Sequence, residues 1–152
     1  MNPLRIYLDT SIFGGLWDKE FREPTLILFE QIKTGKFDLV TSEVVQAEIE
    51  LAPSRVQQSF KEFLPLAELV VVRQEAINLQ QAYLRANIVS VSHTTDALHV
   101  ALATVSDCSS IVSWNFRHIV HFQKVPLYNA VNLTQGYSQI AINSPQEVII
   151  YD

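Results

Sequence analysis

Four polar side chains of this chain are candidates for chemistry. Two of them come where an expected strand ends, and two lie inside expected helices. Asp9 closes the first apolar run of the chain, and Asn115 comes just after a later one. Glu48 lies in the helix expected after the second strand, and Asp96 lies in the first turn of an apolar helix. Because ligands of open α/β sheets bind beyond the carboxyl ends of the strands, these residues are candidates for a functional site.

Each candidate also has a purely structural interpretation. An aspartate that follows a strand often caps a helix or forms a turn. Asp96 could merely complement the helix dipole, and Asn115 could be an ordinary loop residue. Glu48 shares its helix with Glu43 and Glu50, so a solvated acidic face would explain its presence as well as catalysis does.

Asp96 is the candidate that a structural role explains least. Its helix is apolar nearly all round, as helices buried on most sides are. A buried carboxylate is costly unless it is paired, hydrogen-bonded or bound to a metal. His99, one turn further along, could be a metal ligand or a general base, although a buried structural histidine is the simpler alternative. The other histidines, His93, His118 and His121, show no spacing specific to a metal site.

Apolar runs and capping residues predict strands that alternate with helices. We expect strands at 4–8, 37–40, 69–72, 110–113 and 148–151. We expect helices from about residue 12 and over 24–33, 44–51, 53–64, 74–86 and 96–106. This alternation favours a mainly parallel sheet covered on both faces. We therefore predict one three-layer α/β/α domain over residues 1–152, with the strand order left open.

The composition is that of one globular domain. The chain has 152 residues, of which 48% are hydrophobic and 18% charged, which excludes a disordered chain. The single cysteine, Cys108, allows no internal disulfide and fits a reducing compartment. With no signal peptide and no run near the roughly 20 apolar residues of a membrane helix, we expect a cytoplasmic protein without membrane contact. The net charge of 11 − 16 = −5 argues mildly against unaided binding of nucleic acid, unless bound cations supply positive charge.

Four segments, in order along the chain, resemble the four motifs of PIN domains. Residues 6–11, IYLDTS, resemble the opening strand that ends in an acidic residue. Residues 41–49, TSEVVQAEI, resemble the strand end and helix that carry an inward glutamate. Residues 95–103, TDALHVALA, resemble the Asp-Ala-Leu helix, and residues 111–119, IVSWNFRHI, resemble the strand that leads to Ser/Thr-x-Asp. Within the family, the resemblance is to the VapC-like toxins of bacterial toxin–antitoxin pairs.

The resemblance implies a site and an activity. It implies that Asp9, Glu48 and Asp96 converge in one acidic pocket that binds Mg²⁺ or Mn²⁺ and hydrolyses RNA phosphodiester bonds. Asp9 and Asp96 would then bind the first metal directly, and Glu48 would bind through water or orient the nucleophile. Metal ions suit this reaction because they lower the pKa of a bound water and stabilise the leaving oxygen.

One position departs from the family pattern. The fourth motif usually carries an aspartate where this chain has Asn115. An amide oxygen can still ligate a hard cation but adds no charge, so a second metal would be held less tightly. With Ser113, Asn115 would position that second metal or the phosphate, and Thr10 is a further supporting residue.

Two other functions remain as alternatives. A catalytically inactive PIN-like module that binds RNA or protein would fit both Asn115 and the acidic net charge. A phosphatase of the haloacid dehalogenase type would need a second aspartate where this chain has Ser11.

A toxin-like protein implies a small antitoxin partner and a homodimer. Phe13, Trp17 and Phe21 could serve such an interface, or they could belong to the core.

Overall fold

The computed structural model describes residues 2–151. In this part of the chain, five parallel strands form one sheet with the spatial order β3-β2-β1-β4-β5. The strands are β1 Leu4–Leu8, β2 Phe37–Ser42, β3 Ala67–Val70, β4 Ser110–Val112 and β5 Ala141–Asn143. The central strand β1 pairs with β2 on one side and with β4 on the other.

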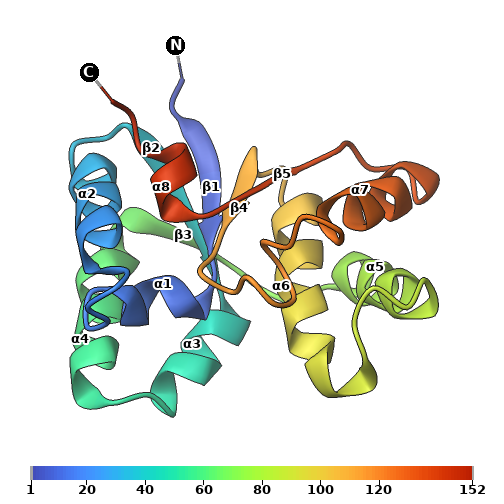
Figure 1. The fold of residues 1–152 in the computed structure, drawn as a ribbon, viewed down its shortest axis with the longest axis horizontal. Helices are drawn as coiled ribbons and strands as arrows, with labels where there is room; N and C mark the ends of the chain where they lie inside the picture. Colours follow the sequence, from blue (N-terminus) through green and yellow to red (C-terminus); the bar gives the residue numbers. More distant parts are fainter. Residues whose placement is uncertain (1, 152) are drawn as a thin grey trace.

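Helices cover both faces of this sheet, as predicted. Figure 1 shows α1 to α4 gathered on one side of the strands and α5 to α7 on the other. The α-helices are α1 Thr10–Gly15, α2 Arg22–Lys33, α3 Glu43–Glu50, α4 Ser54–Phe63, α5 Gln74–Arg85, α6 Thr94–Val105, α7 Val125–Thr134 and α8 Pro145–Val148. Short 3-10 helices at η1 Leu64–Leu66 and η2 Val91–His93 complete the described elements. The three-layer α/β/α fold is therefore confirmed.

The strand order creates a switch point beside β1. After β1 the chain builds outward through β2 and β3, then returns to form β4 on the opposite side of β1. The connections that leave β1 and β4 therefore diverge at their carboxyl ends. Doubly wound sheets bind their ligands in the crevice that such a divergence opens.

The last predicted strand is wrong. The segment 148–151 is not a strand, and the fifth strand is β5, a few residues earlier. Ser144 and Glu147 form a capping box, and Pro145 occupies the first turn, so the chain after β5 starts a short helix. The apolar residues near the C-terminus misled the prediction. No prediction was made for α7.

Helix starts were predicted with mixed success. The sequence predicts a cap at Thr41 or Ser42 for the helix over 44–51, and Ser42 caps α3 by accepting a hydrogen bond from the Val45 N–H at 3.1 Å. The sequence also predicts that Thr94 and Thr95 cap the helix over 96–106, and this is wrong, because α6 already begins at Thr94 and its N-cap residue is His93. The strand predicted at 69–72 lies two residues earlier, at Ala67–Val70.

The aromatic residues near the N-terminus divide between core and surface. Phe13 is buried and packs edge-on against Phe60, so the interface role considered for it is wrong. Phe21 stacks on the buried Trp114 with ring centroids 4.1 Å apart. Trp17 is half exposed. Among the described residues, no helix is both long and apolar enough to cross a membrane.

Candidate functional site

Asp9 lies at the switch point, directly after β1. It is buried, and its backbone N–H donates to the Val112 carbonyl at the end of β4. The hydroxyl of Ser11 donates to Oδ1 at 2.6 Å, and the hydroxyl of Ser113 donates to Oδ2 at 2.7 Å. Burial raises the pKa of the Asp9 carboxyl above its ordinary value, although His99 and the two hydroxyls oppose the shift.

The loop after β4 is tied to Asp9 through the same two serines. The Trp114 N–H donates to the Ser11 hydroxyl oxygen, and the Asn115 N–H donates to the Ser113 hydroxyl oxygen, both at 2.9 Å. The side-chain oxygen of Asn115 accepts the His118 N–H at 2.9 Å, which closes the turn that follows. Ser113 therefore contacts Asp9, and the side-chain oxygen of Asn115 already accepts a backbone hydrogen bond. The positioning of a second metal or of the phosphate by these two residues stays a prediction.

Glu48 projects from α3 toward the same edge of the sheet. The Thr10 hydroxyl donates to Glu48 Oε1 at 2.7 Å, and His99 Nε2 contacts the same oxygen at 2.7 Å. Burial by itself would raise the pKa of Glu48, but the hydrogen bonds and charge of His99, with the Thr10 hydroxyl, hold it below its ordinary value. A lowered pKa keeps Glu48 ionised, and the side chain is still 40% exposed. Glu48 is therefore held in place and remains reachable from solvent.

His99 connects Glu48 to a buried chain of hydroxyls. Its Nδ1 lies 2.8 Å from the Tyr7 hydroxyl, which lies 2.7 Å from the Ser42 hydroxyl. An ionised carboxylate can only accept, so Nε2 carries the proton toward Glu48. In the neutral ring, Nδ1 then accepts the Tyr7 hydroxyl proton. His99 is a buried residue with both nitrogens satisfied.

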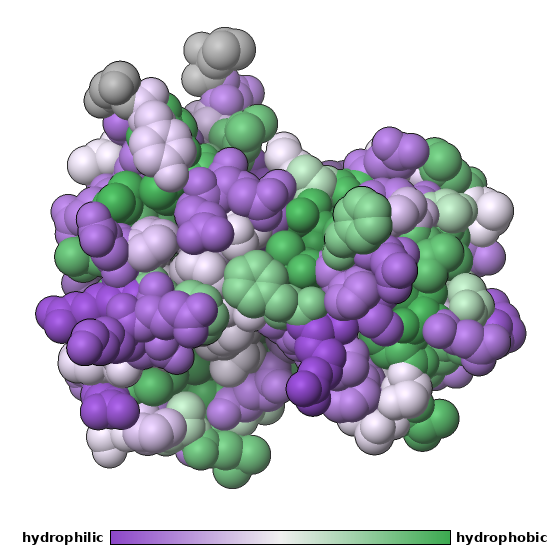
Figure 2. Space-filling view, in the orientation of Figure 1, coloured by the Kyte–Doolittle hydropathy of each residue, from purple (hydrophilic) through white to green (hydrophobic). Residues whose placement is uncertain are grey.

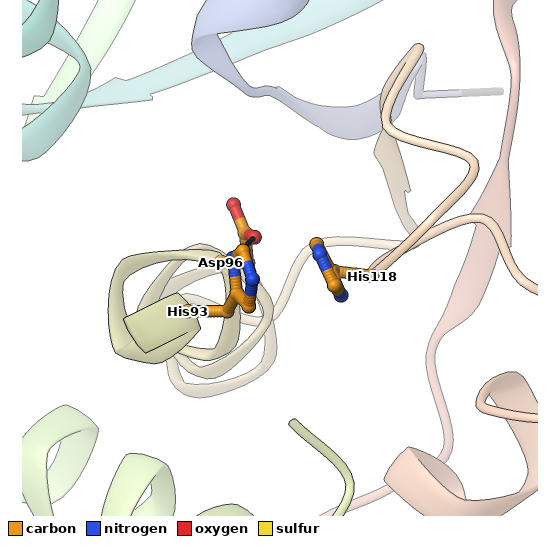
Figure 3. Close-up of side chains that lie close together, drawn as sticks. All are labelled: His93, Asp96 and His118. Carbon is orange, nitrogen blue, oxygen red and sulfur yellow. Dashed lines mark ion pairs between the residues drawn. The ribbon is translucent and has the colours of Figure 1, made fainter. Parts of the chain in front are cut away.

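Asp96 lies with two histidines. Its Oδ2 is 3.7 Å from His93 Nδ1, and the rings of His93 and His118 stack with centroids 3.8 Å apart. Within residues 2–151, His93, Asp96 and His118 are the one group of three potential ligands whose ligand atoms all lie within 4.8 Å of one another. Figure 3 shows His93, the last residue before α6, and Asp96, in the first turn of α6, beside His118 on the loop after β4.

The structure therefore places the predicted residues at one edge of the sheet in two groups. Asp9 and Glu48 form the first, with each carboxylate fixed by hydroxyls and with Glu48 acting on the pKa of Asp9. Asp96 belongs to the second, beside the histidines. The sharing of one ion by all three carboxylates stays a prediction.

A comparison with protein-family models decides the family. Residues 6–120 match the model of the PIN domain, and this match spans all four motifs. The chain belongs to the PIN domain family. The matched range includes Asp9, Glu48, Asp96 and Asn115.

Solved structures share the fold of this PIN domain at low sequence identity. One is VapBC2 from Rickettsia felis bound to a DNA fragment from the promoter, with a TM-score of 0.60, 13% identity, and coverage of 93% of this chain and 98% of that chain. Another is FitAcB from Neisseria gonorrhoeae, with a TM-score of 0.60, 13% identity, and coverage of 94% and 99%. FitAB bound to the IR36 DNA fragment gives a TM-score of 0.62, 12% identity, and coverage of 97% and 99%. No curated protein gives a significant match.

Several residues of this edge were not singled out from the sequence. Tyr7 looks like an ordinary apolar strand residue, and Ser11 was considered as part of the first motif and as the residue that stands where a phosphatase needs a second aspartate. His93 and His118 are separated by 24 intervening residues, so their spacing gives no sign that they meet. The fold brings them together because α6 begins where the loop after β4 passes, and a sequence without strand order cannot show this.

Proposed function

We propose that this PIN domain is a metal-dependent endoribonuclease that hydrolyses RNA phosphodiester bonds. The observation that carries the proposal is the pair Asp9 and Glu48 at the switch point of the sheet. Asp9 is a buried carboxylate with a raised pKa, and Glu48 is a fixed carboxylate with a lowered pKa. Such divergent pKa values at the carboxyl edge of a parallel sheet are typical of a catalytic site rather than of a helix cap.

The donor set fits a hard divalent cation. The proposed ligands Asp9, Glu48, Asp96 and Asn115 offer only carboxylate and amide oxygens, which Mg²⁺ and Mn²⁺ prefer. A cation would also offset the desolvation that raises the pKa of Asp9, because a metal is the largest local charge of its site. When bound, the metal supplies a more acidic water and stabilises negative charge on the phosphate.

The residues of the chain divide the remaining work. Asp9 is held rigidly by two hydroxyls, so it would bind the cation with little loss of side-chain entropy. Within residues 2–151, both side-chain hydrogen bonds to Glu48 are made at Oε1, which leaves Oε2 for a metal-bound or attacking water. Asp96 would complete the first metal site from α6. In this arrangement Thr10 and His99 position Glu48, and Ser113 positions Asp9.

The alternative is a catalytically inactive PIN-like module that binds RNA or protein. One observation favours it: the Asn115 side-chain oxygen already accepts the His118 N–H. An uncharged side chain engaged in a turn would hold a second metal weakly. The proposed nuclease therefore relies on the first metal site.

The proposed partners are RNA, a small antitoxin and a second copy of the chain, in the cytoplasm. The resemblance to VapC-like toxins supports the antitoxin. Exposed apolar side chains support protein partners of some kind, because large exposed apolar patches often mark interaction sites. Figure 2 shows apolar residues gathered near the junction of the two halves of the molecule. Phe116, Phe122 and Leu127 are exposed around the loop and helix that follow β4.

Cleavage of a mixed set of structured and single-stranded RNAs tests the nuclease proposal. We expect wild-type cleavage with Mn²⁺ or Mg²⁺ and none with EDTA. Glu48→Gln and Asp96→Asn should each lose cleavage. Glu50→Gln on the same helix as Glu48 is the matched control, since Glu50 is exposed and the variant should cut like wild type. A folded wild type that binds metal and cuts no RNA would favour the inactive module.

A further inference from the structure

A second kind of metal chemistry is available at the start of α6. We propose that His93, Asp96 and His118 bind a divalent transition-metal ion of the Co²⁺, Ni²⁺ and Zn²⁺ class. This site differs from the oxygen-ligand site of the proposed nuclease in both histidines and shares with it only Asp96. Asp96 is therefore the one point at which this proposal depends on the proposed function.

The first support is the way the chain brings three ligands together. His93 is the N-cap residue of α6 and Asp96 lies in its first turn, and their side chains meet with His93 Nδ1 3.7 Å from Asp96 Oδ2. His118 comes from the loop after β4, and one ligand atom from each residue lies within 4.8 Å of the others. Metal–nitrogen and metal–oxygen bonds are about 2.0–2.2 Å long, so a single ion can be reached by all three side chains once a ring turns.

The second support is the unpaired ring of His118. Both of its nitrogens are buried, and neither has a hydrogen-bond partner among the described residues. A buried polar group without a partner is costly, because it has lost its hydrogen bonds to water. The backbone of His118 is fixed at the same time, since its N–H donates to Asn115 and its carbonyl accepts the Tyr128 hydroxyl. The structure therefore holds an imidazole in place and leaves its nitrogens without a partner.

The ligand types select the class of metal. Two imidazole nitrogens and one carboxylate oxygen suit Co²⁺, Ni²⁺ and Zn²⁺, whereas Mg²⁺ favours oxygen ligands throughout. Three protein ligands also leave at least one position for water or for another group, as open zinc sites do.

Binding must open the stack of the two rings. An imidazole lone pair lies in the ring plane, and the planes of His93 and His118 are only 27° apart. One ring has to turn before both can face one ion. His93 is the ring that can turn, because its side chain is 40% exposed. Metal binding is thus expected to separate the two rings.

Titration with Co²⁺ followed by visible absorption tests the site without any nuclease assay. The full chain carries Glu48→Gln in all samples, so that the oxygen-ligand site is impaired throughout. We expect one Co²⁺ per chain with a d–d absorption band of a site that includes nitrogen ligands. His93→Ala and His118→Ala should each weaken binding at least tenfold, and His121→Ala, three residues beyond His118, should not.

The outcomes separate this proposal from the nuclease proposal. Co²⁺ binding that is unchanged in both His93→Ala and His118→Ala, or weakened equally by His121→Ala, overturns the histidine site. His93→Ala decides the matter if His118→Ala does not fold, because His93 is partly exposed at the end of a helix. A histidine site confirmed in a protein that cuts no RNA would leave this inference standing while the nuclease proposal fails.

Discussion

His99 links Glu48 to Tyr7: its Nε2 lies 2.7 Å from Glu48 Oε1, while its Nδ1 lies 2.8 Å from the Tyr7 hydroxyl. The hydrogen bond between the Tyr7 hydroxyl and Nδ1 holds the His99 ring in the orientation in which Nε2 faces Glu48. Removing a residue that orients a catalytic or metal-binding side chain typically lowers metal affinity or activity by about 10–100-fold.

Tyr7→Phe tests this relationship with the smallest change. Removing the hydroxyl leaves His99 Nδ1 without its hydrogen-bond partner, so we expect a loss of about 1–3 kcal/mol in the free energy of unfolding. We also expect cleavage to fall by about tenfold or more, because His99 no longer has one fixed orientation toward Glu48. Tyr83→Phe removes another buried hydroxyl, one that bonds to Asn132 away from this edge, and serves as the control. Equal cleavage by both variants would contradict a positioning role for Tyr7.

Asp9→Asn should stabilise the metal-free protein. Burial raises the pKa of Asp9 in the folded state above its unfolded value, so the folded state binds this proton more tightly. Wild type therefore loses stability as the pH rises from the unfolded pKa through the folded pKa, and the variant does not. At pH values above the folded pKa of Asp9, we expect Asp9→Asn to be more stable than wild type by about 1 kcal/mol. Substitutions at catalytic positions are often stabilising in this way. Thermal unfolding in EDTA at a series of pH values measures the difference.

Added Mn²⁺ should make wild type more stable than Asp9→Asn. Mn²⁺ binds the folded wild type and raises its unfolding temperature with concentration, whereas Asp9→Asn should respond weakly. If the variant gains as much from Mn²⁺ as wild type does, Asp9 is not a ligand.

Two adjacent glycines should respond in opposite ways to alanine. A Cβ at Gly15 would lie 2.5 Å from the Thr25 hydroxyl oxygen and 2.8 Å from Trp114 Nε1, whereas a Cβ at Gly14 meets nothing within 4 Å. Thr25 and Trp114 are buried and bonded to each other, so they cannot move aside cheaply. We expect Gly15→Ala to cost about 1–3 kcal/mol of stability. Gly14→Ala should be neutral or stabilising by up to about 1 kcal/mol, because alanine favours a helix. Chemical denaturation of both variants measures this.

The thiol of Cys108 should be inert in the native protein. Burial raises its pKa to about 12, so almost none is thiolate at pH 8, and only the thiolate reacts readily. Labelling with a disulfide reagent should therefore follow the rate of unfolding and become fast in denaturant. Fast labelling of the folded chain would show that this part of the core opens easily.

The sequence predicted the part of the fold that depends on local signals. Apolar runs located β1, β2 and β4, and the apolar helix that begins near Asp96 was recognised as buried. The short strand β5 was missed because its three residues, Ala141–Asn143, form no apolar run and its partner, β4, is more than 25 residues away. A strand this short is defined by its neighbour in the sheet and not by its own pattern.

The candidate site shows the same division. Asp9 and Glu48 follow strands that can be recognised locally, and their places at the edge of the sheet agree with the motifs. Ser11 is only two residues from Asp9, but the contacts from Ser113 to Asp9 and from His99 to Glu48 join segments far apart in the chain and could not be derived from spacing. The grouping of Asp96 with histidines likewise depends on tertiary structure.

The most direct test of the nuclease account is the rate of RNA cleavage as a function of Mn²⁺ concentration for wild type, Asp9→Asn and Asp38→Asn. Asp38 is exposed on β2 and controls for the loss of one charge. We predict saturable Mn²⁺-dependent cleavage by wild type and Asp38→Asn, and a rate at least about a hundredfold lower for Asp9→Asn, since a metal contributes several kcal/mol to such reactions. Cleavage by Asp9→Asn at the wild-type rate, or cleavage by wild type that persists in EDTA, would contradict the account.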